Sequence, residues 1–292
     1  MTRPALADYL ALLKLRIAAL LLLVAASGYL VTSGPAVQPV PFLLLMASGL
    51  LASAGASAVN HWADRDLDPV MVRTRDRPIP QGRVPAVHAL VLGVGLLAAA
   101  MALALLVNVL TALFIVLGFV VYVFVYTLGL KRRSVWNIVI GGFSGSCPAL
   151  AGSAAAANAV GLGPALIALL VFLWTPGHFW VLAYRTRDDY RRVGIPMLPA
   201  VLDERSTVRA IAGSTALVPV ATFAFLLTPS FGLAFLGVAA VAGAVLLLRT
   251  ARFIRRPSME TALDGYKFSG LYLTLILAGA MLDAVLAIRI LP

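Results

Sequence analysis

Residues 87–130 read VHALVLGVGLLAAAMALALLVNVLTALFIVLGFVVYVFVYTLGL, a stretch that contains no Asp, Glu, Lys or Arg. A helix needs about 20 apolar residues to cross the hydrocarbon core of a bilayer. The stretch is long enough for two such helices, and its apolar character is interrupted around Val107 and Asn108. It therefore predicts two membrane-spanning helices with a break between them.

The rest of the chain repeats this pattern. Of its 292 residues, 61% are hydrophobic and only 12% are charged, a composition that excludes a soluble domain. We find nine apolar runs of spanning length, at about residues 15–32, 39–60, 87–106, 110–130, 135–157, 164–184, 208–228, 231–248 and 271–288. The run at 135–157 is rich in Gly, Ser and Ala, which permits close helix packing. The sequence predicts an all-α integral membrane protein, in which nine helices surround a central cavity and residues 1–292 form one domain.

The basic residues predict the orientation of these helices, because loops rich in Lys and Arg stay in the cytoplasm. Twenty-two of the 23 basic residues lie at the start of the first run or in the loops after the second, fourth, sixth and eighth runs, and Arg289 alone falls on the other side. This pattern places the N-terminus inside and the C-terminus outside, with the long loops at about 62–86 and 185–207 as a cytoplasmic cap. The formal net charge of +11 is placed to meet lipid and phosphate, so no nucleic acid partner is expected.

Three carboxylates follow the second run, in the segment Asn60-His61-Trp62-Ala63-Asp64-Arg65-Asp66-Leu67-Asp68. If the helix continues through this segment, Asn60, Asp64 and Asp68 share one face, and Asp66 points to solvent or to a nearby arginine. Such a row of oxygen ligands suits Mg²⁺ that also binds a diphosphate. The competing interpretation is a solvated charge run that neutralises the basic loop behind it. A second acidic pair, Asp188-Asp189, after the sixth run favours the metal site.

This composition suits one kind of chemistry. Ionisation of an allylic diphosphate needs cations around the departing group, because negative charge builds up on it as the carbon–oxygen bond breaks. Two acidic clusters that bind Mg²⁺, together with nearby Lys and Arg, supply those cations. The carbocation must be shielded from water in an apolar, aromatic-lined chamber until an acceptor attacks. A helical barrel in the bilayer provides that chamber.

Several motifs resemble those of the UbiA superfamily of intramembrane prenyltransferases, and within it the branch that acts on heme. The superfamily motif N-x-x-x-D-x-x-x-D corresponds to Asn60, Asp64 and Asp68. Further segments match the heme branch: Met71, Arg73, Thr74, Arg77 and Pro78; Tyr126, Thr127, Lys131 and Arg132; and the runs 137–142, 172–180 and 188–199. The likeness is close over about residues 13–199 and extends to the remainder by topology.

The residues and the resemblance together assign a set of expected roles. Mg²⁺ is the expected cofactor, with Asp64, Asp68, Asp188 and Asp189 as its ligands and, with Lys131, as catalytic residues. Substrate binding is expected of Asn60, Arg73, Arg77, Tyr126, Asn137, His178 and Arg191. The resemblance implies farnesyl diphosphate and heme b as substrates, at the cytoplasmic face of the cell membrane, with heme O and diphosphate as products after water adds. It leaves open a heme A synthase or terminal oxidase assembly partner.

Some positions allow two interpretations or depart from the family pattern. A structural histidine and an axial ligand of heme iron are both open for His178, whereas a structural or supporting role is expected of His61. Gly177 stands where the heme branch usually has Pro, and this glycine is expected to free the backbone just before His178. Arg185 stands where the wider superfamily often has Asp. The segment 145–152 has smaller side chains than the heme branch usually has there, which suggests a reshaped acceptor cavity.

Two other functions compete with this hypothesis. The nearer is another UbiA-type enzyme that prenylates an aromatic or quinone precursor or cyclises an isoprenoid diphosphate. The other is a transporter or a non-catalytic assembly factor. A transporter is disfavoured because no charged residue is predicted at mid-membrane.

Overall fold

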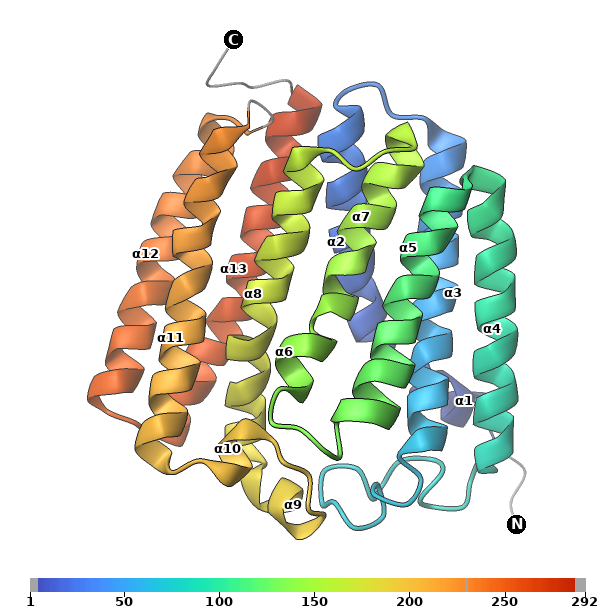
Figure 1. Cartoon of the computed structure of the whole chain (residues 1–292), viewed down its shortest axis with the longest axis vertical. Coiled ribbons are helices and arrows are strands. Elements are labelled where there is room, and N and C mark those ends of the chain that lie inside the picture. Colours follow the sequence, from blue (N-terminus) through green and yellow to red (C-terminus); the bar gives the residue numbers. More distant parts are fainter. Residues whose placement is uncertain (1–4, 229–230, 287–292) are drawn as a thin grey trace.

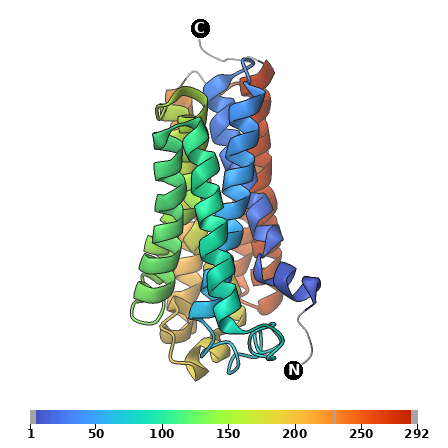
Figure 2. The same ribbon diagram turned by 90° about the vertical axis from the view of Figure 1, so that its right-hand side faces the viewer.

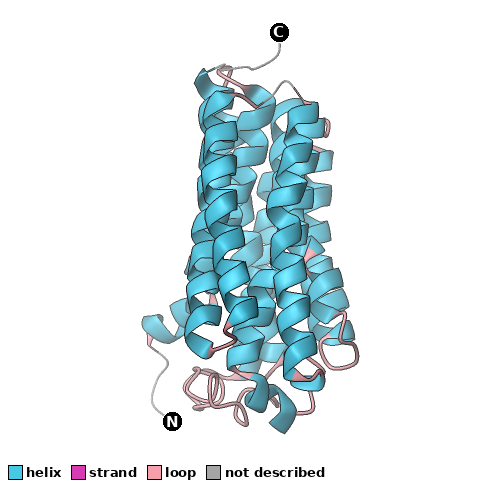
Figure 3. Ribbon diagram, turned by 90° about the vertical axis from the view of Figure 1, so that its left-hand side faces the viewer, coloured by secondary structure: helices cyan, strands magenta, loops and turns pink. Residues whose placement is uncertain are grey.

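The computed structural model describes residues 5–228 and 231–286, and every regular element in these ranges is a helix (Figure 3). Within them, nine helical segments are long and apolar enough to cross a membrane, which confirms the predicted number. They run side by side along the long axis of the bundle (Figure 1). The single-helix spans are α2 (Leu15–Ser33), α3 (Pro39–Ala63), α4 (Ala86–Val107), α8 (Leu162–Arg185), α12 (Leu233–Arg255) and α13 (Met259–Leu286).

The other three spans each combine two helical segments. In the first, α5 (Val109–Val120) continues as a π-helix, Val121–Leu130. In the second, α6 (Asn137–Gly141) is followed by α7 (Phe143–Ala157), and in the third α11 (Glu204–Thr222) ends in a 3₁₀ turn, Phe223–Leu227. Short π-helical insertions often mark functional sites, and the segment Val121–Leu130 adjoins a large cavity.

The short helices and the long loops gather at one end of the bundle. α1 (Leu6–Leu12), α9 (Arg187–Arg192), α10 (Leu198–Val201) and the loop between α3 and α4 lie at the lower end in Figure 1, whereas α13 ends at the upper end. Figure 2 shows α1 projecting from the side of that lower end. The two long loops therefore lie together, as their common predicted side requires, and the assignment of that end to the cytoplasm stays a prediction.

The small residues of the fifth span do permit close packing, as expected. A Cβ atom on Gly152 of α7 would lie 2.2 Å from the carbonyl oxygen of Ala25 in α2. A Cβ atom on Gly28 of α2 would lie 2.1 Å from the carbonyl oxygen of Ala149 in α7. Any larger residue at either position forces the two helices apart, so α2 and α7 form a contact that only glycine allows.

The predicted break between the third and fourth spans falls at Asn108. Its side-chain oxygen accepts a hydrogen bond from the backbone nitrogen of Thr111 (2.7 Å), which caps the start of α5. Its side-chain nitrogen donates to the carbonyl oxygen of Ala154 in α7 (2.8 Å). Asn108 therefore starts one helix and ties the turn to another, because an N-cap oxygen satisfies an amide that the first turn leaves unpaired.

The acidic segment is not a continuation of α3, contrary to the expectation. α3 ends at Ala63, and Asp64 is its C-cap. The predicted common face nevertheless survives, because the backbone nitrogen of Asp64 bonds to the carbonyl oxygen of Asn60 and that of Asp68 bonds to Asp64, both at 2.9 Å. Asp66 faces away as predicted and pairs with Arg132 at 2.6 Å. The hydrogen bond from Arg132 lowers the pKa of Asp66.

The last three spans differ in extent from their apolar runs. α11 begins at Glu204, four residues before the run, because Asp203 caps it by accepting a hydrogen bond from the backbone nitrogen of Ser206 (2.9 Å). α12 continues to Arg255, and the basic residues of its last turn suit a helix C-terminus. α13 begins at Met259, well before its apolar run, since polar residues at the loop end of the bundle also form helix. The end of the ninth run lies outside the described residues.

Candidate active site

A cavity of about 600 Å³ opens at the loop end of the bundle. Its wall is built from the α1–α2 junction, the end of α3, the loop that follows α3, the π-helical segment, and the α8–α9 region. Ligand sites of this size with a few polar groups are typical of enzymes that bind small molecules. Seven predicted site residues line it: Asn60, Asp64, Asp68, Arg73, Arg77, Tyr126 and Lys131.

Asp64 is the most constrained of the cavity carboxylates. Its Oδ2 atom accepts hydrogen bonds from Lys131 Nζ at 2.5 Å and from Asn60 Nδ2 at 2.9 Å. Its Oδ1 atom is buried and has no hydrogen-bond partner within the described part of the chain. A buried carboxylate oxygen without a partner is costly, so this atom is positioned to accept a cation or a donor that enters the cavity.

Among the described residues, the Asp68 carboxylate pairs with one arginine, Arg77. Nη1 of Arg77 lies 2.9 Å from one oxygen of the carboxylate and 2.8 Å from the other. The Asp68 side chain is buried and that of Arg77 is mostly buried, so each charge depends on the other for compensation. The pair places a guanidinium group at the cavity wall, next to the first carboxylate motif.

The first carboxylate motif fits a magnesium ion. Mg²⁺ is usually bound by one or two carboxylates, several waters and substrate phosphates, and Asp64 with Asp68 meets that requirement. The unpaired Oδ1 atom of Asp64 is an available ligand. No three His, Cys, Asp or Glu side chains converge on a metal position within residues 5–228 and 231–286, so a metal here would rely on water and phosphate for its remaining ligands.

The second carboxylate motif lies outside the cavity wall. Asp189 Oδ1 accepts a hydrogen bond from the backbone nitrogen of Val72, and Oδ2 accepts one from that of Arg73, both at 3.2 Å. Arg192 pairs with the same carboxylate at 3.2 Å. The Asp188 side chain is 80% exposed and lies 3.4 Å from Arg191. In this arrangement, Asp189 joins the two long loops, and its oxygens already have partners.

The π-helical segment brings two aromatic rings and a cation to the cavity. Tyr122 and Tyr126 stack with their ring centroids 5.8 Å apart, and both line the cavity with Lys131. The backbone nitrogen of Lys131 bonds to the carbonyl oxygen of Tyr126, five residues earlier, at 2.8 Å. This wider turn places Lys131 on the cavity side. Aromatic faces next to a cation-generating centre stabilise positive charge.

Lys14 is a cavity residue that the sequence interpretation missed. It precedes α2 in a left-handed backbone conformation with a φ of 46°, and its Nζ atom donates to Asn60 Oδ1 at 2.9 Å. Burial, reinforced by the nearby Arg77, lowers the pKa of Lys14 to about 7. The sequence signal was ambiguous, because a lysine at the start of a first span also obeys the rule that basic residues stay inside.

Three other predicted residues lie away from the cavity wall. Asn137 is buried and donates to the carbonyl oxygen of Ser134 (2.7 Å). Arg191 donates to the carbonyl oxygen of Ala200 (2.9 Å). His178 lies on α8, and its contacts are with other aromatic and polar side chains.

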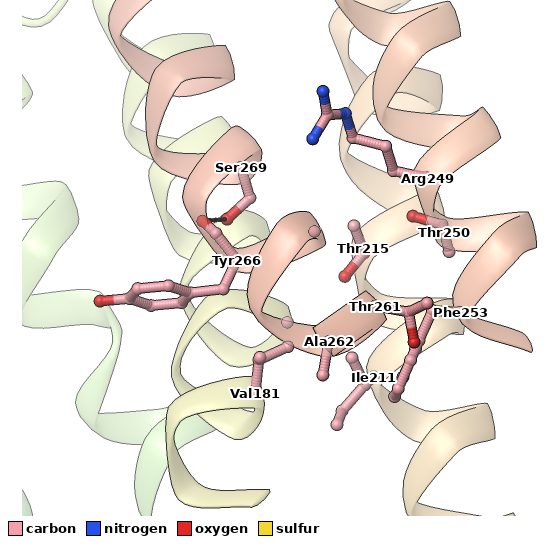
Figure 4. Close-up of a pocket in the computed structure, with 12 residues that line it drawn as sticks. Val181, Ile211, Thr215, Arg249, Thr250, Phe253, Thr261, Ala262, Tyr266 and Ser269 are labelled. Carbon is pink, nitrogen blue, oxygen red and sulfur yellow. Dashed lines mark hydrogen bonds between the residues drawn. The ribbon is translucent and has the colours of Figure 1, made fainter. Parts of the chain in front are cut away.

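His178 is enclosed by neighbouring rings. Its own ring stacks between Trp174, at 4.1 Å, and Tyr266, at 4.3 Å, and Nδ1 lies 2.7 Å from Ser269 Oγ. A narrow crevice of about 20 Å³, enough for roughly one water molecule, lies between α8, α11, α12 and α13 and is lined by Tyr266 and Ser269 (Figure 4). In that view the Tyr266 ring extends away from Thr215. These contacts favour the structural interpretation of His178.

Gly177, which departs from the family pattern, is explained by the close approach of Thr215 on α11. A Cβ atom there would lie 2.7 Å from Thr215 Oγ1 and 3.1 Å from the backbone nitrogen of Thr215. Glycine therefore lets α11 approach α8 closely. The expectation that Gly177 frees the backbone is not supported, because the residue lies inside the continuous helix α8.

Within the described residues, nine apolar spans surround a cavity that brings paired carboxylates, lysine and arginine together at one end, and these features define an integral membrane protein. The model of the UbiA prenyltransferase family matches residues 20–276. The chain belongs to that family. This confirms the resemblance drawn from the motifs.

Curated relatives are similar over most of their length. The chain is 42% identical over 279 residues to protoheme IX farnesyltransferase 2 of Paramagnetospirillum magneticum, covering 94% of this chain and 96% of the relative. It is 44% identical over 244 residues to protoheme IX farnesyltransferase 1 of Cenarchaeum symbiosum, covering 82% and 81% of the two chains.

Solved structures share the fold. A UbiA homolog from Aeropyrum pernix K1 superposes with a TM-score of 0.77 at 22% identity and covers 93% of this chain and 99% of that one. A UbiA homolog from Archaeoglobus fulgidus, bound to DMAPP and Mg²⁺, gives a TM-score of 0.67 at 17% identity, with 94% and 99% covered. At these identities, the likeness establishes the helical architecture alone.

Proposed function

We propose that the protein transfers the farnesyl group of farnesyl diphosphate to the vinyl group of heme b, and so produces heme O and diphosphate as a protoheme IX farnesyltransferase. The names of the relatives that are 42–44% identical over most of the chain support this acceptor and this donor. The observation that carries the chemistry is the pairing of Asp64 with Lys131 and of Asp68 with Arg77 at one cavity wall. A site with two carboxylates and two cations suits a metal-bound diphosphate.

The cavity residues divide into two groups by charge. Lys14, Arg73, Arg77 and Lys131 supply positive charge at the loop end. They would bind the phosphate oxygens and stabilise the negative charge that develops as the carbon–oxygen bond breaks. Mg²⁺ held by Asp64 and Asp68 would supply Lewis-acid stabilisation of the same leaving group. Asp188 and Asp189 remain predicted metal ligands.

The apolar part of the cavity would receive the reacting groups. Tyr122 and Tyr126 present aromatic faces, while Ile17, Ile138 and Phe179 present apolar surface. Such walls exclude water from a carbocation and stabilise its charge. The vinyl group of heme b would attack the first carbon of the farnesyl group, and water would then add to the resulting cation.

The membrane placement is part of the proposal. The loops that surround the cavity carry most of the chain's basic residues, so the site would face the cytoplasm across the cell membrane. Farnesyl diphosphate would enter with its phosphates toward the loops and its tail toward the apolar interior.

The decisive assay uses the purified full chain in detergent with heme b, farnesyl diphosphate and Mg²⁺, with and without a chelator. We expect heme O, identified by liquid chromatography and mass spectrometry, only when Mg²⁺ is available. Diphosphate release without a prenylated heme would point to another acceptor and would refute the heme assignment.

Asp64→Ala tests the metal role within that assay. We expect loss of heme O production with normal expression and membrane insertion, because the variant removes the carboxylate whose Oδ1 atom is available for a cation. Asp66→Ala is the matched control, since Asp66 is exposed and pairs with Arg132 outside the cavity wall. Measurable heme O from Asp64→Ala would contradict the metal role.

A further inference from the structure

His61 has a buried imidazole without a visible partner. The residue is 2% exposed, and neither ring nitrogen has a hydrogen-bond partner among the described residues. A neutral imidazole carries one donor and one acceptor nitrogen, and buried polar atoms of folded proteins almost always find partners. Because His61 lines the large cavity, a molecule in that cavity can supply what the protein does not.

The position of His61 on α3 sets its depth in the cavity. It precedes Asp64 by three residues, and residues three apart lie on the same side of a helix. Three residues of α-helix rise about 4.5 Å. Because α3 ends at Ala63 next to the loops, His61 lies about one turn deeper in the bundle than Asp64. A diphosphate held at Asp64 and Lys131 would therefore direct its first prenyl carbon toward the level of His61.

Most of the neighbouring polar atoms are already engaged, and the exception is Oδ1 of Asp64, the atom assigned to a cation. Asp64 is bound to Lys131, Asp68 to Arg77, and the side-chain oxygen of Asn60 to Lys14. These pairs form the charged end of the cavity, where a polyanion binds. His61 differs from them because it is uncharged in its neutral form and neither of its ring nitrogens has a partner among the described residues. On α3 it lies about one turn deeper than Asp64, the carboxylate assigned to the metal. That is the place where a single water molecule would be needed.

We propose that His61 holds the water molecule that adds to the prenylated vinyl group, an inference that rests on the function proposed above. As the vinyl group bonds to the farnesyl carbon and the bond to diphosphate breaks, positive charge is left on the vinyl carbon next to the porphyrin ring. The water oxygen bonds to that carbon, and one of its protons passes to the acceptor nitrogen of His61. Without a held water, the same cation loses a proton from the adjacent carbon and becomes an alkene.

The two outcomes give products that differ in mass by one water molecule. The test therefore compares hydrated with unhydrated prenyl heme in the assay with heme b, farnesyl diphosphate and Mg²⁺. The hydrated share is the fraction of all prenyl heme that carries the added water. In His61→Ala, we expect this hydrated share to fall by about tenfold or more, since a positioned proton acceptor raises the rate of such a step by roughly 10²–10⁴. In His61→Gln, we expect a smaller fall of about threefold, because the amide holds a water but takes no proton.

The control and the contrary results are distinct. His88→Ala changes a histidine that bonds to Tyr9 at the exposed end of α4 (3.0 Å), and the hydrated share should equal that of the wild type. An unchanged hydrated share in His61→Ala overturns the proposal. If, in addition, the absorption band of bound heme changes in this variant, His61 is an iron ligand and does not hold the water. If His61→Ala forms no prenyl heme, an unchanged share in His61→Gln overturns it. Failure of the proposed function itself would appear as absence of prenyl heme from the wild type.

Discussion

Replacing Asp189 by asparagine separates two roles that the same carboxylate can have. The sequence predicts a magnesium ligand, whereas the structure shows Asp189 accepting hydrogen bonds from the backbone nitrogens of Val72 and Arg73, 117 and 116 residues earlier. The segment it holds carries Arg73 and Arg77, which both line the cavity. In the structure, Asp189 is thus a clamp between the two long loops.

The size of the expected effect follows from these contacts. The Asp189 side chain is 10% exposed, so solvent screens its hydrogen bonds weakly. Each hydrogen bond to a charged acceptor contributes about 1.5–3 kcal/mol, and an asparagine oxygen recovers one bond at about 0.5–1.5 kcal/mol. The amide NH₂ of the asparagine then faces the other backbone N–H group. Both distances are 3.2 Å, near the long end of the usual range. We therefore expect a net loss of about 2 kcal/mol in the free energy that holds the Arg73 segment in place.

A loss of that size corresponds to a rise in the KM for farnesyl diphosphate of up to about thirtyfold, at 1.4 kcal/mol per tenfold. Diphosphate release is measured while farnesyl diphosphate and Mg²⁺ are varied separately, and amide exchange is measured at Val72 and Arg73. The clamp predicts faster exchange and an unchanged Mg²⁺ concentration for half-maximal rate. A strongly raised Mg²⁺ requirement with unchanged exchange would refute the clamp and establish the metal ligand. Asp188→Asn, at an 80% exposed position, should change neither the amide exchange at Val72 and Arg73 nor the Mg²⁺ concentration for half-maximal rate if the clamp is correct.

Three further predictions concern the cavity and its surroundings. Because burial lowers the pKa of Lys14 to about 7, its ammonium group is present below that pH and lost above it. We therefore expect kcat/KM for farnesyl diphosphate to fall as the pH rises through about 7, and Lys14→Arg should remove this fall. An identical pH profile in the variant would exclude Lys14 as the group that titrates. Gly177→Ala should destabilise the protein by about 1–3 kcal/mol through overpacking, as measured by unfolding in detergent. Adding Thr215→Ala to this variant should recover part of the lost stability, because the closest contact of the new Cβ atom, at 2.7 Å, is with Thr215 Oγ1. Arg77→Gln leaves the Asp68 carboxylate buried without its charge partner, so we expect a loss of about 3–5 kcal/mol in stability; a variant as stable as the wild type would show that the pair is dispensable.

Features that depend on local sequence were predictable. The nine spans follow from apolar runs of sufficient length, and the shared face of Asn60, Asp64 and Asp68 follows from their four-residue spacing. That face persists even though the helix ends at Ala63, because the hydrogen bonds of Asp64 and Asp68 keep the same four-residue step. The break at Asn108 also follows from a polar residue between two apolar runs.

Features that depend on the approach of distant segments were not predictable. Asp189 carries the right chemistry for a metal ligand, and its sequence does not indicate that two backbone nitrogens of another loop occupy its oxygens. Gly177 appeared to be a departure that loosens the backbone, yet its reason is the proximity of Thr215 on another helix. His61 appeared to have only a supporting role, because no sequence pattern shows that its ring lacks partners and lines a cavity.

Lys131 and Arg132 show why charge alone does not identify site residues. Both obey the rule that basic residues stay inside, and they are adjacent in sequence. Lys131 binds the buried Asp64, whereas Arg132 binds Asp66, whose side chain is 58% exposed. The π-helical turn just before them directs Lys131 into the cavity, while the next residue points outward to solvent. Removing the Arg132 pair should therefore have little effect on stability, as is usual for exposed ion pairs, whereas Lys131 is the positive partner of a buried carboxylate. Which basic residues serve the site is thus determined by helix geometry, and the topology rule selects only the side of the membrane.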